Sequence, residues 1–477
     1  INFSHMAFRS SWPRKLKSTL LRISWATFYV PSKIFLCLLC AFVLRKRALK
    51  MRRSLLRTRI ELETFAKLDA ISRKTRRRKL KSNHENNNFA TKDGRRDDAS
   101  APAWMRVERT EMKTRFELAL KEQEERLEGL DSDCEKHLYV LMHGLAGSED
   151  DLLALATELI MDKNNVVFIP KSCTPMRSFD GIVAGGERIV DELEEFIENY
   201  DDDDDGKKRT NLKWISFVGN SMGGLYCRYV LTRLFERDSK TICGLEMHTF
   251  LTTATPHLGV GEFGYFDLVP GYLRQWAGCG LGQSVKDLCM FDVEDEDFDV
   301  NDKQKLPLLA RMTMDDEENN MFFIEALASF KRRCTYANSC NDFLVAYETA
   351  SIRHDKLSRK QEAEWATLSG GPQVVFDDVL TLEDRGLAKL QPNQDRTELI
   401  KKNKKIVGNE RYTKFMEYNL RSAGFFRHVD VVFPGPMPIA HNKIVALQRN
   451  ELTAKWFKEG EIIVRHTANY LKSDIDL

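Results

Sequence analysis

The fold is decided by Gly219-Asn220-Ser221-Met222-Gly223, a pentapeptide that joins the apolar run 214–218 to the helix-like run 224–231. A strand, a tight turn centred on a serine and a helix can therefore be read from one stretch of chain. This context is typical of a nucleophile elbow, in which the serine occupies a strained turn and exposes its hydroxyl above the sheet. A side chain at either flanking glycine would clash, because strand and helix must approach closely there. Ser221 is therefore the candidate nucleophile.

A second motif lies upstream of the elbow. The apolar run 137–142 predicts a buried strand, and residues 143–148, with Gly144 and Gly147, turn out of it. Attack by a serine on an ester carbonyl puts negative charge on oxygen, so two backbone N–H donors must already point there. The amides of Leu145 and Met222 are the candidates for this oxyanion hole. Together the motifs predict an α/β protein of the α/β-hydrolase class, with a mostly parallel central sheet flanked by helices.

The general base is expected late in the chain, because this fold places its residues in the order Ser, acid, His. His441 follows the strand-like run 429–433 and a turn rich in proline and glycine. A loop after the last strand can bring its imidazole over the sheet toward Ser221. The other histidines considered are predicted to be structural: His143, His257, His428 and His466.

The acid is less well defined by the sequence. Asp342 follows the short strand-like run 334–337 and a polar turn, and it lies between Ser221 and His441 in chain order. Its carboxylate would accept the Nδ1–H of His441, fix the tautomer and stabilise the imidazolium. Asp430 is a rival that chain order leaves open.

Several segments resemble the lipase-like putative serine esterases, a family of α/β-hydrolases of plants, fungi and protists that act on acyl lipids. The matching residues lie between 143 and 442: His143-Gly144-Leu145 with Gly147, Gly181-Ile182 with Gly186 and Arg188, 216–225, 254–259, Tyr336-Ala337-Asn338 through Asp342 to Ser351-Ile352-Arg353, and Ala440-His441-Asn442. The resemblance implies that Ser221 is the nucleophile, Asp342 the acid and His441 the base. One departure is Asn220, where the family usually carries histidine, and this change bears on substrate preference.

The charge is distributed unevenly along the chain. Residues 1–81 hold 22 Lys and Arg but three acids, a net charge of +19, whereas the whole chain carries +2. We therefore interpret residues 1–82 as a basic N-terminal arm appended to an acidic body. No nucleic-acid partner is expected, because no recognition fold accompanies the basic run 73–79.

A short apolar segment, about 23–44, lies within the arm and is interrupted at Lys33. A spanning helix needs about 20 apolar residues, whereas an interfacial helix needs fewer and gains from basic flanks on anionic lipid. Either mode would associate the protein with a membrane, and the basic residues after Leu44 would place the catalytic part on the cytoplasmic side. A cleaved signal or an organelle transit peptide are the alternatives.

The remaining chain divides into a polar linker with an amphipathic helix (83–133) and a catalytic domain (134–477). Two insertions interrupt that domain, at about 261–305 and 354–412. The first is rich in aromatic residues and glycine and could be a lid over the site or ordinary packing. The second is charged, which indicates a surface excursion.

The sequence thus predicts a serine hydrolase, a lipase or esterase that cleaves carboxylic esters of acyl lipids through an acyl-enzyme intermediate. No metal or organic cofactor is expected, because nucleophile, base and oxyanion donors all come from the chain. Acyl transfer to an alcohol and a non-catalytic membrane adaptor are the alternatives, and the oligomeric state stays open.

Overall fold

The computed structural model describes residues 111–127, 135–201, 212–261, 263, 282–293, 305–354, 364–368, 370–381, 383–385, 410–435 and 437–473. The basic arm, its apolar segment and the polar linker 83–103 lie outside these ranges, as do residues 264–281 and 294–304 of the first insertion. The predictions made for those segments stay predictions.

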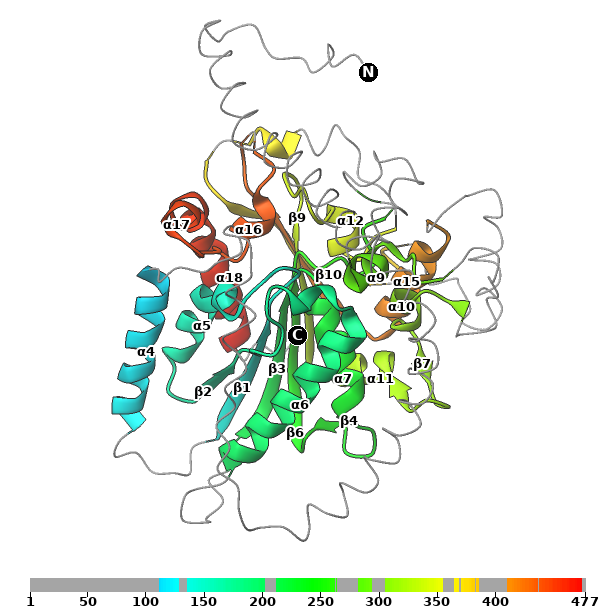
Figure 1. The fold of residues 1–477 in the computed structure, drawn as a ribbon. Coiled ribbons are helices and arrows are strands. Elements are labelled where there is room, and N and C mark those ends of the chain that lie inside the picture. Colours follow the sequence, from blue (N-terminus) through cyan, green and yellow to red (C-terminus); the bar gives the residue numbers. More distant parts are fainter. Residues whose placement is uncertain are drawn as a thin grey trace, which may run out of the picture. The chain divides into compact units, whose positions relative to one another are not determined.

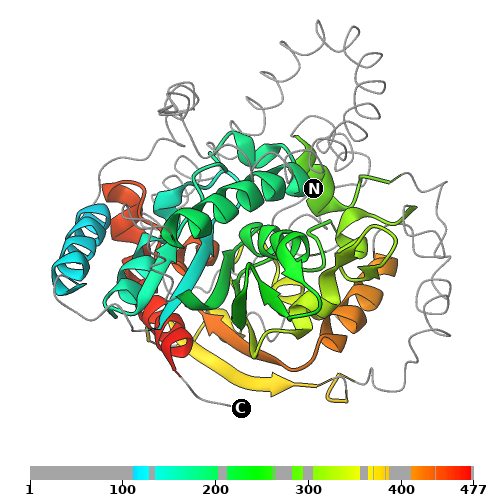
Figure 2. The same ribbon diagram turned by 90° about the horizontal axis from the view of Figure 1, so that it is seen from below.

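Nine of the described strands form one large sheet, and two short strands, Asp315–Asp316 and Met321–Phe322, form a separate pair (Figures 1 and 2). Its main path runs in the order β10 (Gln373–Leu380), β11 (Phe426–Val432), β9 (Arg332–Asn338), β6 (Leu245–Thr253), β3 (Leu212–Asn220), β1 (Lys136–Met142) and β2 (Asn165–Phe168). Every neighbouring pair from β11 to β2 is parallel, whereas β10 runs antiparallel to β11. Two short strands, β4 (Phe235–Glu236) and β5 (Thr241–Ile242), extend β6 in antiparallel pairing. The predicted mostly parallel α/β fold is confirmed.

Helices cover both faces of the sheet because the strands are apolar on both sides. In β1, Leu138 and Val140 join one buried cluster, while Tyr139 and Leu141 join the other. The first cluster is completed by α6 (Ile182–Asp201), α7 (Gly223–Leu234), α11 (Phe323–Ala328) and α15 (Glu410–Ser422). The second is completed by α4 (Glu111–Leu127), α5 (Leu153–Ile160) and α18 (Glu461–Lys472) (Figure 1). The amphipathic helix predicted before the catalytic domain is α4.

Shorter elements complete the described part of the chain. They are η4 (Glu149–Leu152), η5 (Arg177–Phe179), α9 (Gln283–Cys289), α10 (Leu308–Arg311), β7 (Asp315–Asp316), β8 (Met321–Phe322), α12 (Tyr347–Ala350), α16 (Ala440–Lys443), α17 (Glu451–Phe457) and η9 (Lys458–Gly460). Several of them connect the carboxyl ends of the parallel strands to the following helices, and these connections form the candidate site.

The second insertion contributes more to the fold than its charge indicated. Strand β10 lies inside it and pairs along its length with β11, from Gln373 opposite Val432 to Leu380 opposite Phe426. Its side chains are half-buried or exposed, as expected for an edge strand. The segment 354–412 is therefore partly a structural element of the sheet.

The described part of the first insertion packs against the start of α6. Ser284 of α9 accepts a hydrogen bond from the Gly181 amide at 2.9 Å, and the Asp287 carboxylate accepts one from the Ile182 amide at 2.9 Å. Most residues of the first insertion, which the sequence analysis interprets as a possible lid, lie outside the described ranges, so that interpretation stays a prediction. Among the helices that the structure describes, none has the length and apolarity needed to cross a bilayer.

Candidate active site

Ser221 occupies the turn between β3 and α7, where the sequence predicts a nucleophile elbow. Its φ of 54° lies in the left-handed region, which a residue with a side chain rarely adopts and which marks a strained backbone. The Ser221 amide donates to the Thr253 carbonyl of β6 at 2.9 Å, so the strained turn is tied to the neighbouring strand. Ser221 is partly exposed, whereas Asn220 and Met222 on either side are buried. The predicted strand, turn and helix are confirmed.

Glycine is required around the elbow by direct contact. A Cβ on Gly219 would lie 2.3 Å from the Gly224 Cα, and one on Gly223 would lie 2.1 Å from the Met142 carbonyl oxygen. A Cβ on Gly144 would lie 2.6 Å from the Ser221 Cβ, so the loop after β1 passes directly beside the serine. Real Cβ atoms do not approach backbone this closely, and the clash predicted for side chains flanking Ser221 is confirmed.

We expect Gly223→Ala to destabilise the protein by about 3 kcal/mol or more, because the added methyl meets rigid backbone of β1. Gly371→Ala is the matched control, since nothing lies within 4 Å of its Cβ position. Urea unfolding of both variants and the wild type checks this. Equal midpoints for the two variants would show that the elbow is not packed as described.

Asp342 and His441 form a buried acid–base pair. The Nδ1 of His441 lies 3.0 Å from Asp342 Oδ2, although the two residues are 99 positions apart in the chain. Asn338 Nδ2 donates to the same oxygen at 2.8 Å. The amides of Leu344 and Val345 donate to the other oxygen at 2.9 and 2.8 Å. Four donors therefore fix the carboxylate, and the carboxylate fixes the orientation of the imidazole ring.

Backbone pairing holds the two loops together. Asp342 and Ile439 form an antiparallel bridge between the loop after β9 and the loop after β11. The Ala440 amide donates to the Asn341 carbonyl at 3.0 Å, and the Asn341 side chain donates to the carbonyls of Phe433 and Gly435. Asn341 has a φ of 61°, a conformation that asparagine tolerates better than most residues. Main-chain contacts thus set the position of Asp342 relative to His441.

The three predicted triad residues follow the carboxyl ends of β3, β9 and β11, which lie at the same edge of the sheet. Only β6 separates β3 from β9, and β9 pairs directly with β11. The structure brings Asp342 and His441 into contact. Within the described residues no hydrogen bond joins the Ser221 hydroxyl to His441.

The candidate oxyanion donors lie on the two segments nearest Ser221. Met222 is the N-cap residue of α7, whose amino end carries partial positive charge, and Leu145 lies in the loop after β1. The loop is closed by the Gly147 amide donating to the Gly144 carbonyl at 3.1 Å. Its Ala146 amide donates to the Ser178 hydroxyl at 2.7 Å. Neither the Leu145 amide nor the Met222 amide donates to another described residue.

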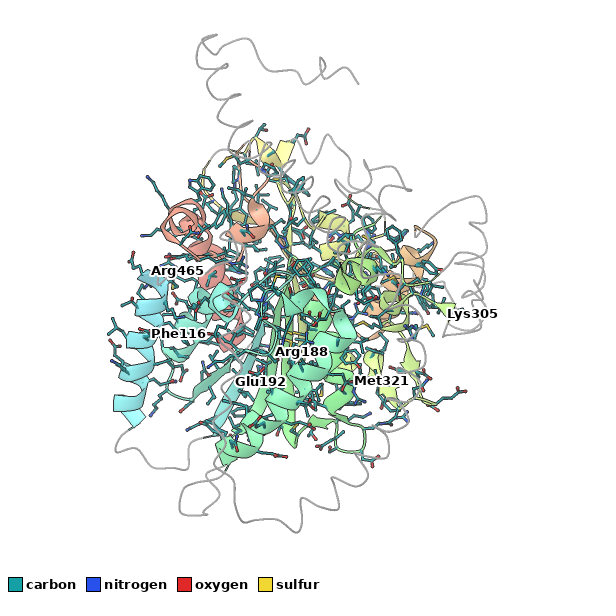
Figure 3. The ribbon with its side chains drawn as sticks, in the orientation of Figure 1. Phe116, Arg188, Glu192, Lys305, Met321 and Arg465 are labelled. Carbon is teal, nitrogen blue, oxygen red and sulfur yellow. The ribbon has the colours of Figure 1, made fainter. Side chains whose placement is uncertain are left out.

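The segment that carries Ser178 is held by two side chains of α6, Arg188 and Glu192, which are labelled in Figure 3. Arg188 bonds to the Asp180 carboxylate at 3.1 Å and to the Arg177 carbonyl at 2.9 Å. Glu192 accepts from the amides of Lys171 and Ser172. The support for the oxyanion loop therefore extends back through η5 to α6.

The other candidate histidines form hydrogen bonds to residues other than Ser221 and Asp342. Their partners are the Gly144 carbonyl for His143, the Thr252 hydroxyl for His257, the Thr335 hydroxyl and Arg421 for His428, and the Tyr336 hydroxyl for His466. Burial lowers the pKa of each ring. These contacts agree with the structural roles expected for them.

The rival acid, Asp430, does not face His441. Its carboxylate accepts from the Tyr347 hydroxyl at 2.6 Å and lies 3.8 Å from the Arg353 guanidinium. Burial raises the pKa of Asp430 to about 6, against the lowering effects of Tyr347 and Arg353. Asp430 therefore supports α12, the helix that follows the Asp342 loop.

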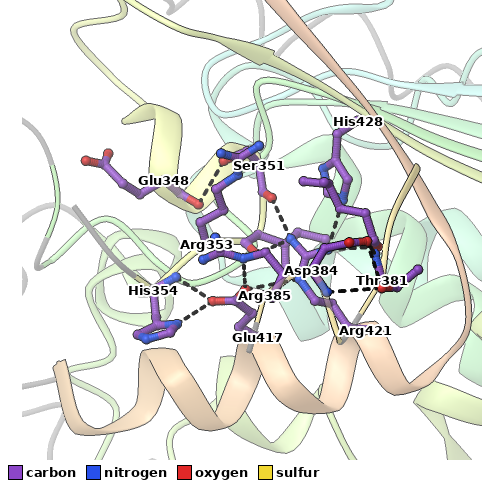
Figure 4. Close-up of polar contacts among 12 residues, drawn as sticks. Glu348, Ser351, Arg353, His354, Thr381, Asp384, Arg385, Glu417, Arg421 and His428 are labelled. Carbon is purple, nitrogen blue, oxygen red and sulfur yellow. Dashed lines mark hydrogen bonds and ion pairs between the residues drawn. The ribbon is translucent and has the colours of Figure 1, made fainter. Parts of the chain in front are cut away.

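A second and larger polar network is centred on Glu417, and Figure 4 shows its contacts. Glu417 of α15 is completely buried and accepts hydrogen bonds from His354, Arg385 and Arg421. Burial acts to raise the pKa of Glu417, but these three donors hold it down to about 2. Arg421 also donates to the carbonyls of Ser351 and Ile352, and Ile352 has a strained φ of 52°. The network thus clamps the chain that leaves α12.

The raised pKa of Asp430 predicts a pH-dependent difference in stability. In the unfolded chain an aspartate has a pKa of about 3.9, so the folded state binds the proton more tightly. The contribution of Asp430 to folding is therefore greatest below pH about 4 and is lost as the pH rises through about 6. Asn cannot ionise but can still accept from Tyr347, so Asp430→Asn should gain stability relative to the wild type across this window.

Urea unfolding of both proteins at pH 4.5 and pH 7 measures the difference, and the contribution of Glu417 cancels because both proteins retain it. Stability curves that stay parallel across this range would contradict the assignment.

Sequence reasoning did not single out the residues that support the Asp342–His441 pair, nor those of the network around Glu417. Asn338 and Asn341 lie inside a matching segment, yet polar turn residues after a strand are common and carry no specific signal. Glu417 and Arg421 have the spacing of a surface ion pair on a helix, which hid their burial.

A parallel sheet with an elbow serine after β3, and an aspartate–histidine pair after β9 and β11, defines the α/β-hydrolase fold. Residues 132–352 match the family described as putative serine esterases (DUF676), which confirms the resemblance drawn from the motifs. The match includes Leu145, Ser221, Met222 and Asp342, while His441 lies beyond it. A general esterase or lipase function is supported by this family.

Curated relatives in two yeasts are similar over a comparable length. The chain is 29% identical over 225 residues to "Putative lipase ROG1" of Saccharomyces cerevisiae, covering 46% of this chain and 28% of the relative. It is 26% identical over 235 residues to "Putative lipase C4A8.10" of Schizosaccharomyces pombe, covering 48% of this chain and 27% of the relative. The similarity thus spans less than a third of these relatives.

A solved structure titled "RedJ with PEG molecule bound in the active site" is 14% identical, with a TM-score of 0.24. The similarity covers 46% of this chain and 74% of that chain. A TM-score this low supports no inference about function.

Proposed function

We propose that this protein is a serine hydrolase that cleaves carboxylic esters of acyl lipids, with Ser221 as nucleophile, His441 as base and Asp342 as acid. The observation that carries the proposal is the buried 3.0 Å contact between His441 Nδ1 and Asp342 Oδ2 at the sheet edge that also bears the strained Ser221 turn. The match of residues 132–352 to a family of serine esterases supports the general function, a serine hydrolase acting on esters.

In the proposed reaction Ser221 Oγ attacks the ester carbonyl carbon while His441 Nε2 takes the hydroxyl proton. The carbonyl electron pair moves onto oxygen, where the amides of Leu145 and Met222 stabilise the negative charge. Collapse of this intermediate breaks the bond to the alcohol, which leaves with the proton from His441. Water then attacks the acyl-serine by the same proton path and releases the carboxylic acid. Catalytic hydrogen bonds often tighten only when substrate binds, so we expect the Ser221–His441 contact to form in the complex.

Acyl lipids are the proposed substrates for two reasons. The yeast relatives carry lipase names, and the first insertion is rich in aromatic residues that could shield acyl chains. Membrane association through the basic arm, with the catalytic domain on the cytoplasmic side, belongs to the same proposal and would bring the enzyme to its substrate.

A fluorophosphonate probe tests the nucleophile, and a panel of mono-, di- and phospho-glycerides tests the substrate class. We expect covalent labelling of the wild type and release of fatty acid from at least one lipid. Failure to label the folded wild type would favour the non-catalytic adaptor instead. Transfer of the acyl group to an added alcohol, in preference to water, would favour an acyltransferase.

A further inference from the structure

A buried ion pair joins the loop of the candidate oxyanion hole to the segment that carries the candidate base. Asp151 of η4 and Arg449 are 298 positions apart, yet Arg449 Nε and Nη2 donate to the two carboxylate oxygens at 2.8 and 2.6 Å. The side chains are 5% and 15% exposed. This two-point contact fixes the distance between the groups and the plane of the guanidinium.

On one side, Asp151 is built into the oxyanion loop. Its carboxylate accepts from the Ser148 amide at 3.2 Å and from the Ser148 hydroxyl at 3.3 Å. A Cβ on Gly147 would lie 2.9 Å from Asp151 Oδ2, so the carboxylate packs directly on that residue. The Gly147 amide closes the turn by donating to the Gly144 carbonyl, and Leu145 lies within that turn. A change in the position of Asp151 is therefore expected to move the Leu145 amide.

On the other side, Arg449 is connected to His441 by a compact segment. The Leu447 amide donates to the Asn442 carbonyl at 3.0 Å, and the Ala446 amide donates to the Lys443 carbonyl at 2.9 Å. The Arg449 amide donates to the Thr453 hydroxyl at 3.0 Å, which anchors it to the start of α17. Arg449 and His441 therefore belong to one packed unit.

A buried ion pair adds little net stability, because desolvation of the two charges offsets much of their attraction. What this ion pair contributes is a fixed distance and orientation between the two loops. We infer that Asp151 and Arg449 are positioning residues, which hold the Leu145 amide at a fixed place relative to the His441 ring. The inference rests on the proposed function, in which both groups act on one substrate carbonyl.

The test uses the full chain with a soluble short-chain ester. Arg449→Lys keeps the charge but loses the two-point contact, and Asp151→Asn and Arg449→Met each remove one charge. Because displacement of a donor by about 1 Å can cost about 10²-fold in rate, we expect kcat to fall between 10- and 100-fold in each variant. KM should stay within about threefold. The double variant Asp151→Asn/Arg449→Met should be no slower than the worse single variant, since both lose the same contact.

The matched control is Arg427→Lys. Arg427 of β11 also makes a two-point contact with an aspartate, Asp377 of β10, with one bond of 2.7 Å. Arg427 lies at the amino end of β11, whereas the segment that carries His441 follows the carboxyl end of that strand. Its kcat should stay within twofold of the wild type. An unchanged kcat in folded Arg449→Lys, or rate losses that simply multiply in the double variant, would overturn the inference.

Hydrogen exchange separates this inference from the proposed function, because it requires no catalysis. In Arg449→Met the amides of 144–148 and of 440–447 should both exchange faster, whereas Arg427→Lys should change neither region. Faster exchange confined to 440–447 would overturn the positioning role whatever the activity. Absence of ester hydrolysis in the wild type, with coupled exchange retained, would instead count against the proposed function alone.

Discussion

Ser221→Ala should lower kcat for a soluble ester by on the order of 10⁵-fold or more and should abolish labelling by a fluorophosphonate. The methyl group cannot form an acyl intermediate, so the reaction loses its covalent route and retains only the contribution of the oxyanion donors. The substitution removes one oxygen from a partly exposed side chain, so folding should be little changed. Steady-state kinetics with highly purified protein measure the loss, and the melting temperature confirms that the variant is folded.

Ser339→Ala is the matched control for this experiment. Ser339 lies in the loop after β9, near the same edge of the sheet, and its buried hydroxyl has no hydrogen-bond partner among the described residues. Its removal should leave kcat within about twofold, because nothing loses a partner. A Ser221→Ala variant with substantial activity would mean that another group is the nucleophile.

Asp342→Asn should lower kcat by about 10⁴-fold while leaving the elbow intact. The amide can turn its NH₂ group toward His441 Nδ1, which would then have to accept a hydrogen bond and carry the wrong tautomer for a base at Nε2. It would also fail to stabilise the imidazolium that forms when Ser221 loses its proton. Kinetics on a soluble ester across pH 6 to 9 measure the effect.

Asp430→Asn distinguishes the two candidate acids. Asp430 contacts Tyr347 and Arg353 rather than His441, so its replacement should lower kcat by less than about tenfold. An effect on kcat as large as that of Asp342→Asn would assign the acid role to Asp430 and require the loops to rearrange in the complex.

Much of the core could be predicted from sequence because most residues of its central strands are buried. The runs that became β1 and β3 are largely apolar, and the ends of β9 and β11 that precede the site are buried and followed by turn residues. Strand β10 escaped prediction for the opposite reason. It is a half-exposed edge strand containing Asp377 and Asp378, and its place is decided by pairing with β11 rather than by its own pattern.

The residues of the candidate site differ in the same way: some are marked by local sequence patterns and others only by contacts between distant residues. Ser221 could be predicted from a local motif, since the strained turn needs glycine on both sides. Which aspartate, Asp342 or Asp430, contacts His441 could not be predicted from sequence, because that contact depends on the backbone bridge between Asp342 and Ile439. The contact between Asp151 and Arg449 could not be predicted from the sequence, because each residue alone looks like an ordinary charged residue near a helix end.

The order of the strands has a consequence for how the candidate site is assembled during synthesis. The proposed base and its supporting segment come from residues 426–449, whereas the proposed nucleophile and acid lie before residue 343. A nascent chain that has reached residue 352 would hold two of the three proposed catalytic groups beside a β9 strand whose outer edge is unpaired, a surface prone to association with other chains. Docking of β11 would then cover that edge and bring in the His441 imidazole together. On the proposed function, a prematurely ended product would be both inactive and prone to aggregate.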